Sequence, residues 1–429
     1  MKTKTIKINY LARVEGEGAL DVRIKDDDVQ HVKLKIFEPP RFFEAFLIGR
    51  KYNEVPDITS RICGICPVAH QLTTSHALEN AFGQAVDGQL RALRRLLYCG
   101  QYIESHALHI FLLHAPDFLG YDDAIRMSKD HADTVKTGLE LKKYGNELLT
   151  LLGGREIHPV NGCVGGFYKL PEKEDLTKIS DKLKKGRDKA YETVQWLSGL
   201  DFPGLEQDYE YVCLSHPDEY ALCEGNIISS KGVNIPIDEY EQNFIESHVP
   251  YSTSLQSKID DKRTFFVGPM ARYNLNFDQL SSLTKKAAKS AKIEPPCNNP
   301  FKSIIIRAME MLYAFDEAVR LIDGYRKPDR ASIEIKPRAG TGYGCTEAPR
   351  GLLYHRFSVN ENGVITGAKI VTPTAQNQII IEDDLRKFIS KHIKMNEEEL
   401  QWKCEQIIRN YDPCISCSVH YLKLKINRE

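Results

Sequence analysis

The sequence predicts a mixed, predominantly α-helical fold: a long helix bundle with peripheral β hairpins and small α/β subdomains. Apolar residues recur at helical spacing over 87–115 and 300–325, so both segments are expected to form long helices. Apolar and polar residues alternate near the N-terminus and around a turn at 360–363, which is typical of hairpins. With 429 residues, the chain can share one large core.

The composition is that of an ordinary globular protein. Apolar residues make up 42% of the chain and charged residues 27%, and a formal net charge of −1 argues against a nucleic-acid-binding surface. No apolar run reaches the roughly 18 residues of a membrane span, and the N-terminus lacks the apolar core of a signal peptide. Most of the 11 cysteines are isolated, which fits a reducing compartment. A cytoplasmic location is therefore expected.

Residues 1–60 are expected to form an N-terminal β region followed by one helix. The alternation over 3–37, interrupted by an aspartate-rich turn, predicts a hairpin or meander. Two prolines at positions 39 and 40 then break the strand pattern. An amphipathic helix is expected from Arg41 to about Tyr52.

Residues 61–200 are expected to form the helical core. A helix is predicted over 67–82, where the initial proline suits the first helical position because its missing N–H costs nothing there. Leucine-rich periodicity predicts the long helix over 87–115. Further helices are predicted at about 130–152 and 173–199, the second beginning with an acidic first turn.

The remaining chain divides into three segments of the same single domain. A peripheral subdomain is expected over 201–272, because short β-prone runs replace the helical pattern. These runs are Tyr209–Leu214, Tyr220–Cys223 and Thr264–Val267. Over 273–420, the predicted elements are helices at about 277–291, 300–325, 378–392 and 396–409, with a hairpin formed by Leu352–Val359 and Val364–Val371. Residues 421–429 are treated as a separate last segment.

Two Cys-x-x-Cys motifs, one near each end of the chain, are the strongest functional signal. They are Cys63-Gly-Ile-Cys66 and Cys414-Ile-Ser-Cys417. Each spacing lets two thiolates bind one metal, and together the motifs supply four sulfur ligands, which favour a soft or borderline transition metal. Disulfides and a structural zinc site are the alternatives. Zinc ribbons usually close their ligands within one short module, so ligands from both ends favour a buried catalytic metal.

The chain resembles the large subunit of a nickel–iron hydrogenase in these motifs and in several others. Arg-x-Cys-Gly-x-Cys-x-x-x-His covers 61–70, and Asp-Pro-Cys-x-x-Cys-x-x-His covers 412–420. Four shorter motifs occur in the expected order: Arg13–Gly16, Arg41–Glu44, Gly154–Pro159 and Glu347–Gly351. The resemblance implies the large-subunit fold of that family and the reversible heterolytic cleavage of dihydrogen.

The resemblance also implies a nickel–iron centre and assigns its ligands. Cys63 and Cys414 would bind nickel terminally. Cys66 and Cys417 would bridge nickel to an iron that carries one carbonyl and two cyanides. The pocket for these diatomic ligands would be lined by Pro349, Arg350, Pro373 and Thr374.

A second, hard cation is implied as well. Magnesium would be bound by Glu44, the backbone of Ile370 and His420, since oxygen ligands suit this ion. On its pattern alone, Glu44 is equally a solvated helix carboxylate. In the family, a dedicated endopeptidase removes a C-terminal extension once nickel is in place, which here would be residues 421–429. A permanent edge strand is the alternative for that segment.

The catalytic residues implied by the resemblance are Glu15, Arg350, Asp117 and Asp412. Glu15 together with a ligand thiolate is favoured as the proton route, because an arginine with a pKa above roughly 12 is a poor base. Arg350 would then orient and stabilise, held by Asp117 and Asp412 through charge-assisted hydrogen bonds. Without the resemblance, Glu15 and Asp117 are ordinary turn carboxylates. Three nearby histidines are expected to pack in the core rather than bind metal: His106, His109 and His114.

Electrons must leave through a partner, since the other cysteines are isolated and form no set for an iron–sulfur cluster. An iron–sulfur small subunit is therefore implied. The motifs are most similar to cytosolic, multi-subunit hydrogenases of the sulfhydrogenase type, which are coupled to NAD(P) through a flavin subunit. Coupling to deazaflavin or to a heterodisulfide reductase is the near alternative. The quinone-side subunit of respiratory complex I shares this ancestry but lacks the four cysteines.

Overall fold

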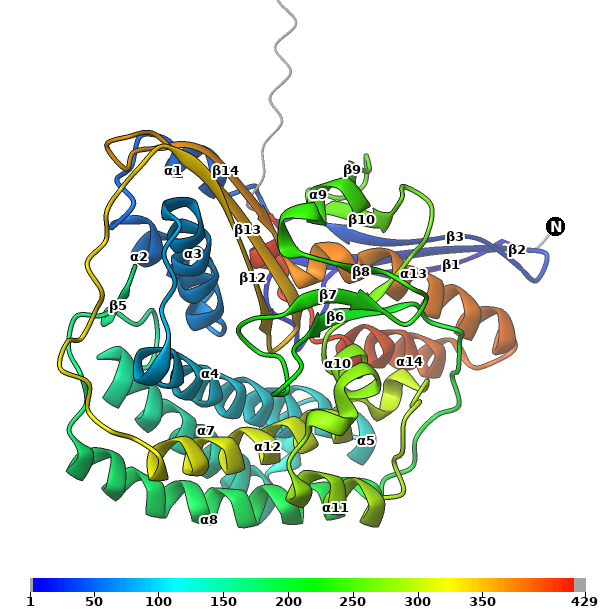
Figure 1. Ribbon diagram of the computed structural model, residues 1–429. Helices are drawn as coiled ribbons and strands as arrows, with labels where there is room; N and C mark the ends of the chain where they lie inside the picture. The colour runs from blue at the N-terminus through cyan, green and yellow to red at the C-terminus, as the bar shows by residue number, and fades with distance from the viewer. Residues whose placement is uncertain (1–2, 420–429) are drawn as a thin grey trace, which may run out of the picture.

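A bundle of long helices forms one side of the molecule, and small sheets cover the other (Figure 1). The computed structural model describes residues 3–419. The bundle consists of α4 (Gly88–Leu108), α7 (Ala132–Gly153), α8 (Lys173–Ser198) and α12 (Ser303–Asp323). Helix α4 packs against α7 and α12, and α12 also packs against α8. The predicted mixed, predominantly α-helical fold is confirmed.

The long helix predicted over 87–115 changes its winding before it ends. Helix α4 is followed by a π-helical turn, η1 (His109–His114), and then by α5 (Ala115–Leu119). Such turns are rare and often occur at functional sites. His106 Nε2 lies 3.0 Å from Glu310 Oε2, and His109 Nε2 lies 2.8 Å from the carbonyl oxygen of Arg409. His114 is fully buried beside them, so all three histidines pack in the core as predicted.

Most other predicted helices are present. Those near the predicted bounds are α3 (Pro67–Phe82), α11 (Ser282–Ser290), α13 (Pro373–Lys391) and α14 (Glu397–Asn410). The prediction of one helix from Arg41 to Tyr52 is wrong, because Gly49 takes a φ of +85°. Only the short helix α1 (Phe43–Leu47) forms within that range, and a second short helix, α2 (Val55–Ser60), follows it. The remaining short α-helices are α6 (Ala124–Met127), α9 (Tyr240–Asn243), α10 (Pro269–Asn276) and α15 (Ile415–Ser418).

Two of the sheets are antiparallel and three-stranded. The N-terminal meander consists of β1 (Thr3–Ile8), β2 (Gly18–Lys25) and β3 (Asp28–Ile36), as predicted. The other sheet consists of β12 (Gly340–Ala348), β13 (Gly351–Val359) and β14 (Ile365–Val371). Helix α3 packs on β12 so closely that a Cβ at Gly342 or Gly344 would clash with its backbone. The glycines that permit this contact also weaken the strand pattern of β12 in the sequence.

The β-prone segment 201–272 forms a four-stranded sheet and a hairpin, and a second hairpin lies earlier in the chain. The sheet has the order β11 (Phe266–Val267), β6 (Tyr211–Ser215), β7 (Asn226–Ser229) and β8 (Asn234–Ile235). The hairpins are β9 (Phe244–His248) with β10 (Leu255–Ile259), and β4 (Gly162–Cys163) with β5 (Gly166–Phe167). The strand predicted at Tyr220–Cys223 is absent. This segment is a buried loop, in which the Tyr220 hydroxyl donates a hydrogen bond to Glu310 over 2.6 Å.

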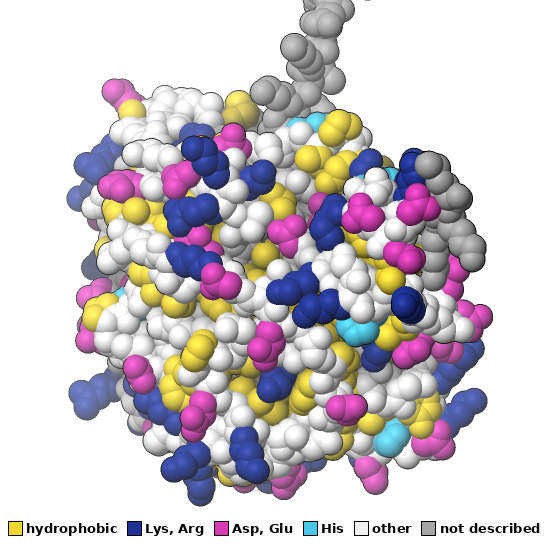
Figure 2. Space-filling view, turned by 90° about the vertical axis from the view of Figure 1, so that its right-hand side faces the viewer, with side chains coloured by type: hydrophobic (Ala, Val, Ile, Leu, Met, Phe, Trp, Pro, Cys, Tyr) yellow, Lys and Arg dark blue, Asp and Glu magenta, His cyan; other side chains and the backbone are white. Residues whose placement is uncertain are grey.

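Basic and acidic side chains alternate over the face shown in Figure 2, with hydrophobic atoms between them. That face therefore carries no broad field of one sign, as the net charge of −1 leads one to expect. Across residues 3–419, no helix combines the length and the apolar character that a membrane crossing requires.

Candidate metal centre

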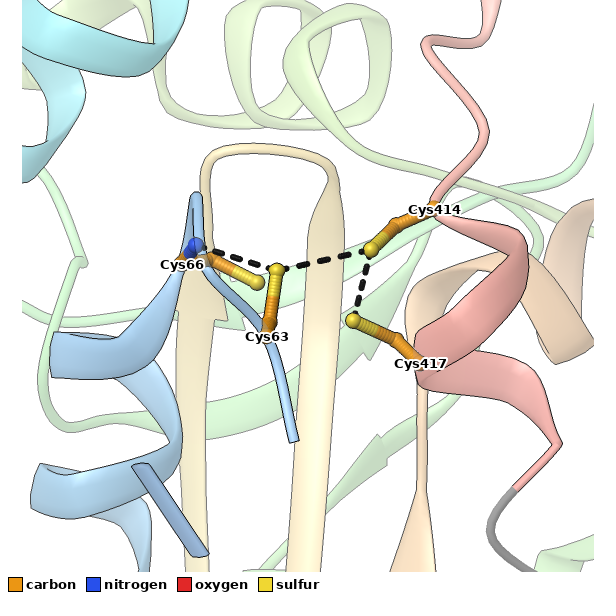
Figure 3. Close-up of side chains that lie close together, drawn as sticks. All are labelled: Cys63, Cys66, Cys414 and Cys417. Atoms are coloured by element: carbon orange, nitrogen blue, oxygen red, sulfur yellow. Dashed lines mark hydrogen bonds between the residues drawn. The ribbon is translucent and has the colours of Figure 1, made fainter. Parts of the chain in front are cut away.

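The two Cys-x-x-Cys motifs meet in the interior of the protein. The sulfurs of Cys63, Cys66, Cys414 and Cys417 all lie within 4.8 Å of one another, and all four residues are buried. Cys63 Sγ and Cys414 Sγ are 3.5 Å apart although 351 residues separate them in the sequence. Figure 3 shows the two pairs pointing toward each other from opposite segments. All four thiols are free, so the predicted convergence is confirmed and the disulfide alternative is wrong.

The first motif occupies the loop between α2 and α3. Cys63 Sγ accepts hydrogen bonds from the backbone N–H groups of Ile65 (3.3 Å) and Cys66 (3.2 Å). Cys66 is the N-cap of α3, whose first helical residue is Pro67. Backbone donors and a helix N-terminus both favour the thiolate form that a metal ligand requires.

The second motif is held by a turn and by α13. Asp412 takes a φ of +51° at the end of α14, which turns the chain toward the centre. The N–H group of Cys414 then donates to Thr374 Oγ1 over 2.9 Å. Helix α13 begins at Pro373, so this hydroxyl comes from its first turn. Pro349, Pro373 and Thr374, three of the predicted pocket residues, are all buried.

The donor set fits a transition metal. Burial raises the pKa values of the Cys414 and Cys417 thiols well above the usual range. A hydrogen bond from Cys414, together with those from the other two cysteines, instead holds the pKa of Cys63 well below it. Four thiolates this close together need cations to offset their mutual repulsion, and soft sulfur ligands disfavour magnesium or calcium.

Arg350 lies beside the sulfurs and is fixed by Asp412. Its Nε donates to the carbonyl oxygen of Asp412 over 2.7 Å, and its Nη2 donates to Oδ1 over 3.1 Å. Burial alone would lower the pKa of Arg350, but Asp412 and the cysteine sulfurs raise it well above its usual value. The Arg350 guanidinium therefore stays charged. Within residues 3–419, its buried Nη1 has no hydrogen-bond partner, so one donor is available to a polar ligand of the centre.

Glu15 contacts a ligand sulfur directly. The Cys414 thiol donates to Glu15 Oε2 over 3.1 Å, and the N–H of Ser416 donates to the same oxygen over 3.0 Å. The Ser416 hydroxyl donates to Glu38 Oε2 over 2.9 Å, and both glutamates are half-buried. Sequence reasoning missed Ser416 and Glu38. Ser416 lies at a position that the Cys-x-x-Cys pattern leaves unspecified, and Glu38 lies in no motif.

Asp117 does not hold Arg350, so that prediction is wrong. Its carboxylate accepts hydrogen bonds from Arg409 over 2.7 and 2.8 Å, and from Arg13 over 2.6 Å. Burial alone would raise the pKa of Asp117, but Arg409 and Arg13 lower it. Arg13 lies two residues before Glu15, and Arg409 is in α14. Asp117 therefore ties the loop that carries Glu15 to the helix that leads into the second cysteine motif.

Glu44 and Ile370, two of the three residues expected at the magnesium site, are in contact. Glu44, in α1, accepts a hydrogen bond from the backbone N–H of Ile370, in β14, over 2.8 Å. This contact brings the Glu44 carboxylate next to the backbone from which the second ligand is expected. His420, the third residue, lies outside the described residues.

The chain is similar in sequence to known proteins over nearly its whole length. A family model described as nickel-dependent hydrogenase matches residues 41–138 and 237–420. The chain is 37% identical to the alpha subunit of sulfhydrogenase 1 from Pyrococcus furiosus over 98% of both chains. It is 35% identical to the alpha subunit of sulfhydrogenase 2 from the same organism, over 98% of this chain and 100% of that one.

Solved structures agree with this likeness. The crystal structure of an NAD+-reducing nickel–iron hydrogenase in its dihydrogen-reduced state superposes with a TM-score of 0.86 at 25% identity, covering 97% of this chain and 99% of the other. Four buried cysteine sulfurs converge here, and the sequence likeness extends over nearly the whole chain. The chain therefore belongs to the nickel-dependent hydrogenase family, as the catalytic large subunit of a nickel–iron hydrogenase.

Proposed function

We propose that the protein cleaves dihydrogen at a nickel–iron centre on its four cysteines and passes the electrons through an iron–sulfur subunit to NAD(P). The contact that carries this proposal is the 3.1 Å hydrogen bond between Cys414 Sγ and Glu15, which joins a metal ligand to a proton acceptor. The NAD(P) assignment is supported by the NAD+-reducing structural relative. It implies flavin-containing partner subunits and a cytoplasmic location.

Each residue of the centre would have a role that follows from its chemistry. Cys63 and Cys414 would bind nickel, and Cys66 and Cys417 would bridge it to iron with its carbonyl and cyanide ligands. The bound metals would supply the Lewis acidity that polarises dihydrogen. Thr374 and the free Nη1 of Arg350 would donate hydrogen bonds inside the pocket.

The protein groups provide an exit for the proton. Glu15 Oε2 would take it from the sulfur of Cys414, with which it already shares a hydrogen bond. The N–H of Ser416 stabilises the carboxylate before the transfer. Beyond Glu15, the hydroxyl of Ser416 donates a hydrogen bond to Glu38, so these two groups could carry the proton further. Arg350 would remain protonated throughout and would fix the position of the segment after Asp412.

Metal analysis of the purified complex tests the proposed centre. Nickel and iron are expected together, with infrared bands from the diatomic ligands of the iron, because the four clustered sulfurs would hold both metals. Dihydrogen-dependent reduction of NAD(P)+ should accompany them. Zinc as the sole metal would reject the centre. Full metal content with reduction of deazaflavin alone, or of a heterodisulfide alone, would reject only the proposed acceptor.

We further propose that magnesium is bound by Glu44, the backbone of Ile370 and His420, and that a maturation endopeptidase removes residues 421–429. The match to the family model ends at residue 420, which supports cleavage after His420. Intact-mass measurement of the nickel-loaded protein should then show a chain ending at His420. A precursor made without nickel is the control and should retain Glu429. Active enzyme that still ends at Glu429 would refute the cleavage.

A further inference from the structure

A buried arginine that no motif singles out contacts the segment leading to Arg350. Arg272 lies on α10 and is completely buried. An arginine has five N–H donors in a rigid fork, and here all five are used. Its hydrogen bonds go to Glu310 (2.7 and 2.7 Å), Glu347 (2.8 Å) and the carbonyl oxygens of Ala348 (2.9 Å) and Pro349 (3.0 Å).

Tyr102 completes the support from the other side. Its ring centroid lies 5.2 Å from the Arg272 guanidinium, and its hydroxyl donates to the carbonyl oxygen of Glu347 over 2.8 Å. The three consecutive carbonyl groups before Arg350 are thus each held by Arg272 or Tyr102. Tyr102 belongs to α4, so the bundle itself fixes this backbone.

The start of α10 touches Arg350 as well. Gly268, the N-cap of α10, has a φ of +117°, and a Cβ on it would lie 2.7 Å from the carbonyl oxygen of Arg350. The N–H of Arg272 donates to the carbonyl oxygen of Gly268 over 3.0 Å. The first turn of α10 therefore joins Arg272, which holds the backbone before Arg350, to Gly268, which packs against Arg350.

We propose that Arg272 is a positioning residue for Arg350. It fixes the backbone of 347–349 so that the Arg350 guanidinium stays against Asp412 and beside the cysteine sulfurs. This inference rests on the proposed function of the centre. A lysine at position 272 would keep the positive charge between Glu310 and Glu347. Its single nitrogen cannot also reach two carbonyl groups in a fixed plane, so the backbone before Arg350 would be released.

The test is Arg272→Lys in the complete, metal-loaded complex. Nickel and iron content should stay unchanged while dihydrogen turnover per nickel falls about 100-fold, as a misplacement near 1 Å is known to cause. The infrared bands of the diatomic ligands should also shift, because Arg350 lines their pocket. The matched control is Arg94→Lys. Arg94 is also buried, donates to both oxygens of Glu79 (2.8 and 2.5 Å) and to the carbonyl oxygen of Cys163 (3.1 Å), and within residues 3–419 it makes no hydrogen bond to 347–350.

A purely structural role for Arg272 predicts a different outcome. Both lysine variants would then lose thermal stability but keep normal turnover per nickel and unshifted infrared bands. That result would overturn the inference. If Arg272→Lys does not yield folded protein, Tyr102→Phe decides, since it removes only the hydroxyl bonded to Glu347. That variant should lose turnover about tenfold and shift the same bands; no change would overturn the inference. An unaltered complex that contains nickel and iron but does not turn over dihydrogen would instead reject the proposed function.

Discussion

Cys414→Ser is expected to abolish dihydrogen turnover and to reduce the nickel content by at least about tenfold. The substitution removes a soft sulfur ligand from a set whose members lie within 4.8 Å of one another. It also removes the thiol that donates to Glu15. A serine hydroxyl is a hard, weakly acidic donor that does not replace a thiolate on nickel. Nickel and iron determination by mass spectrometry, together with a turnover assay, measures both effects.

Cys404→Ser provides the matched control for this experiment. Cys404 is also buried and free, and it lies in α14 only ten residues before Cys414. It is not among the clustered sulfurs of the described chain, so its serine variant should keep both its nickel and its turnover. A Cys414→Ser protein with full nickel content would show that the metal is held elsewhere.

Glu15→Gln is expected to reduce turnover by about 100- to 10,000-fold while nickel content and folding stay normal. Glutamine keeps the shape of the side chain, and its carbonyl oxygen can still accept the N–H of Ser416. It cannot take a proton from the Cys414 thiol. Steady-state dihydrogen oxidation per nickel, compared with the rate of dihydrogen–deuterium exchange, would locate the loss at proton transfer.

Glu17→Gln is the control for a change in charge on the same loop. The Glu17 side chain is exposed, and within residues 3–419 only its backbone forms hydrogen bonds: its N–H donates to Glu38 Oε2, and its carbonyl oxygen accepts from the N–H of Phe37. Its variant should behave like the unaltered protein. Normal turnover in Glu15→Gln would exclude Glu15 from the proton route, whereas a loss of nickel would show that Glu15 helps to hold the centre.

The sequence predicts well the elements whose pattern is local. Helix α3 begins and ends at the predicted residues, because Pro67 starts it and Gly83, with a φ of +64°, ends it. The hairpin of β13 and β14 is also local, since its strands flank a turn rich in asparagine and glycine. The meeting of the two cysteine motifs could be inferred from ligand chemistry alone, because four sulfurs make one complete set.

The rest depends on contacts between distant residues. The glycines that let α3 approach strand β12 also weaken the strand pattern of β12 in the sequence. Asp117 pairs with Arg409 and Arg13 instead of Arg350, and the three arginines look alike when only the sequence is read. Arg272 and Glu38 stand in no recognisable motif. Their partners lie on segments far away in the chain, so only the fold reveals what they do.

The distance between the cysteine pairs has a consequence for how the protein is made. Cys63 leaves the ribosome 351 residues before Cys414. At a synthesis rate of about 5 to 20 residues per second, the first pair waits roughly 20 to 70 s for the second. Throughout that interval the nascent chain exposes two thiols that have no complete set of ligands to join. The centre can thus be assembled only after the second motif has been synthesised, and until then the thiols of Cys63 and Cys66 are open to oxidation and to other metals.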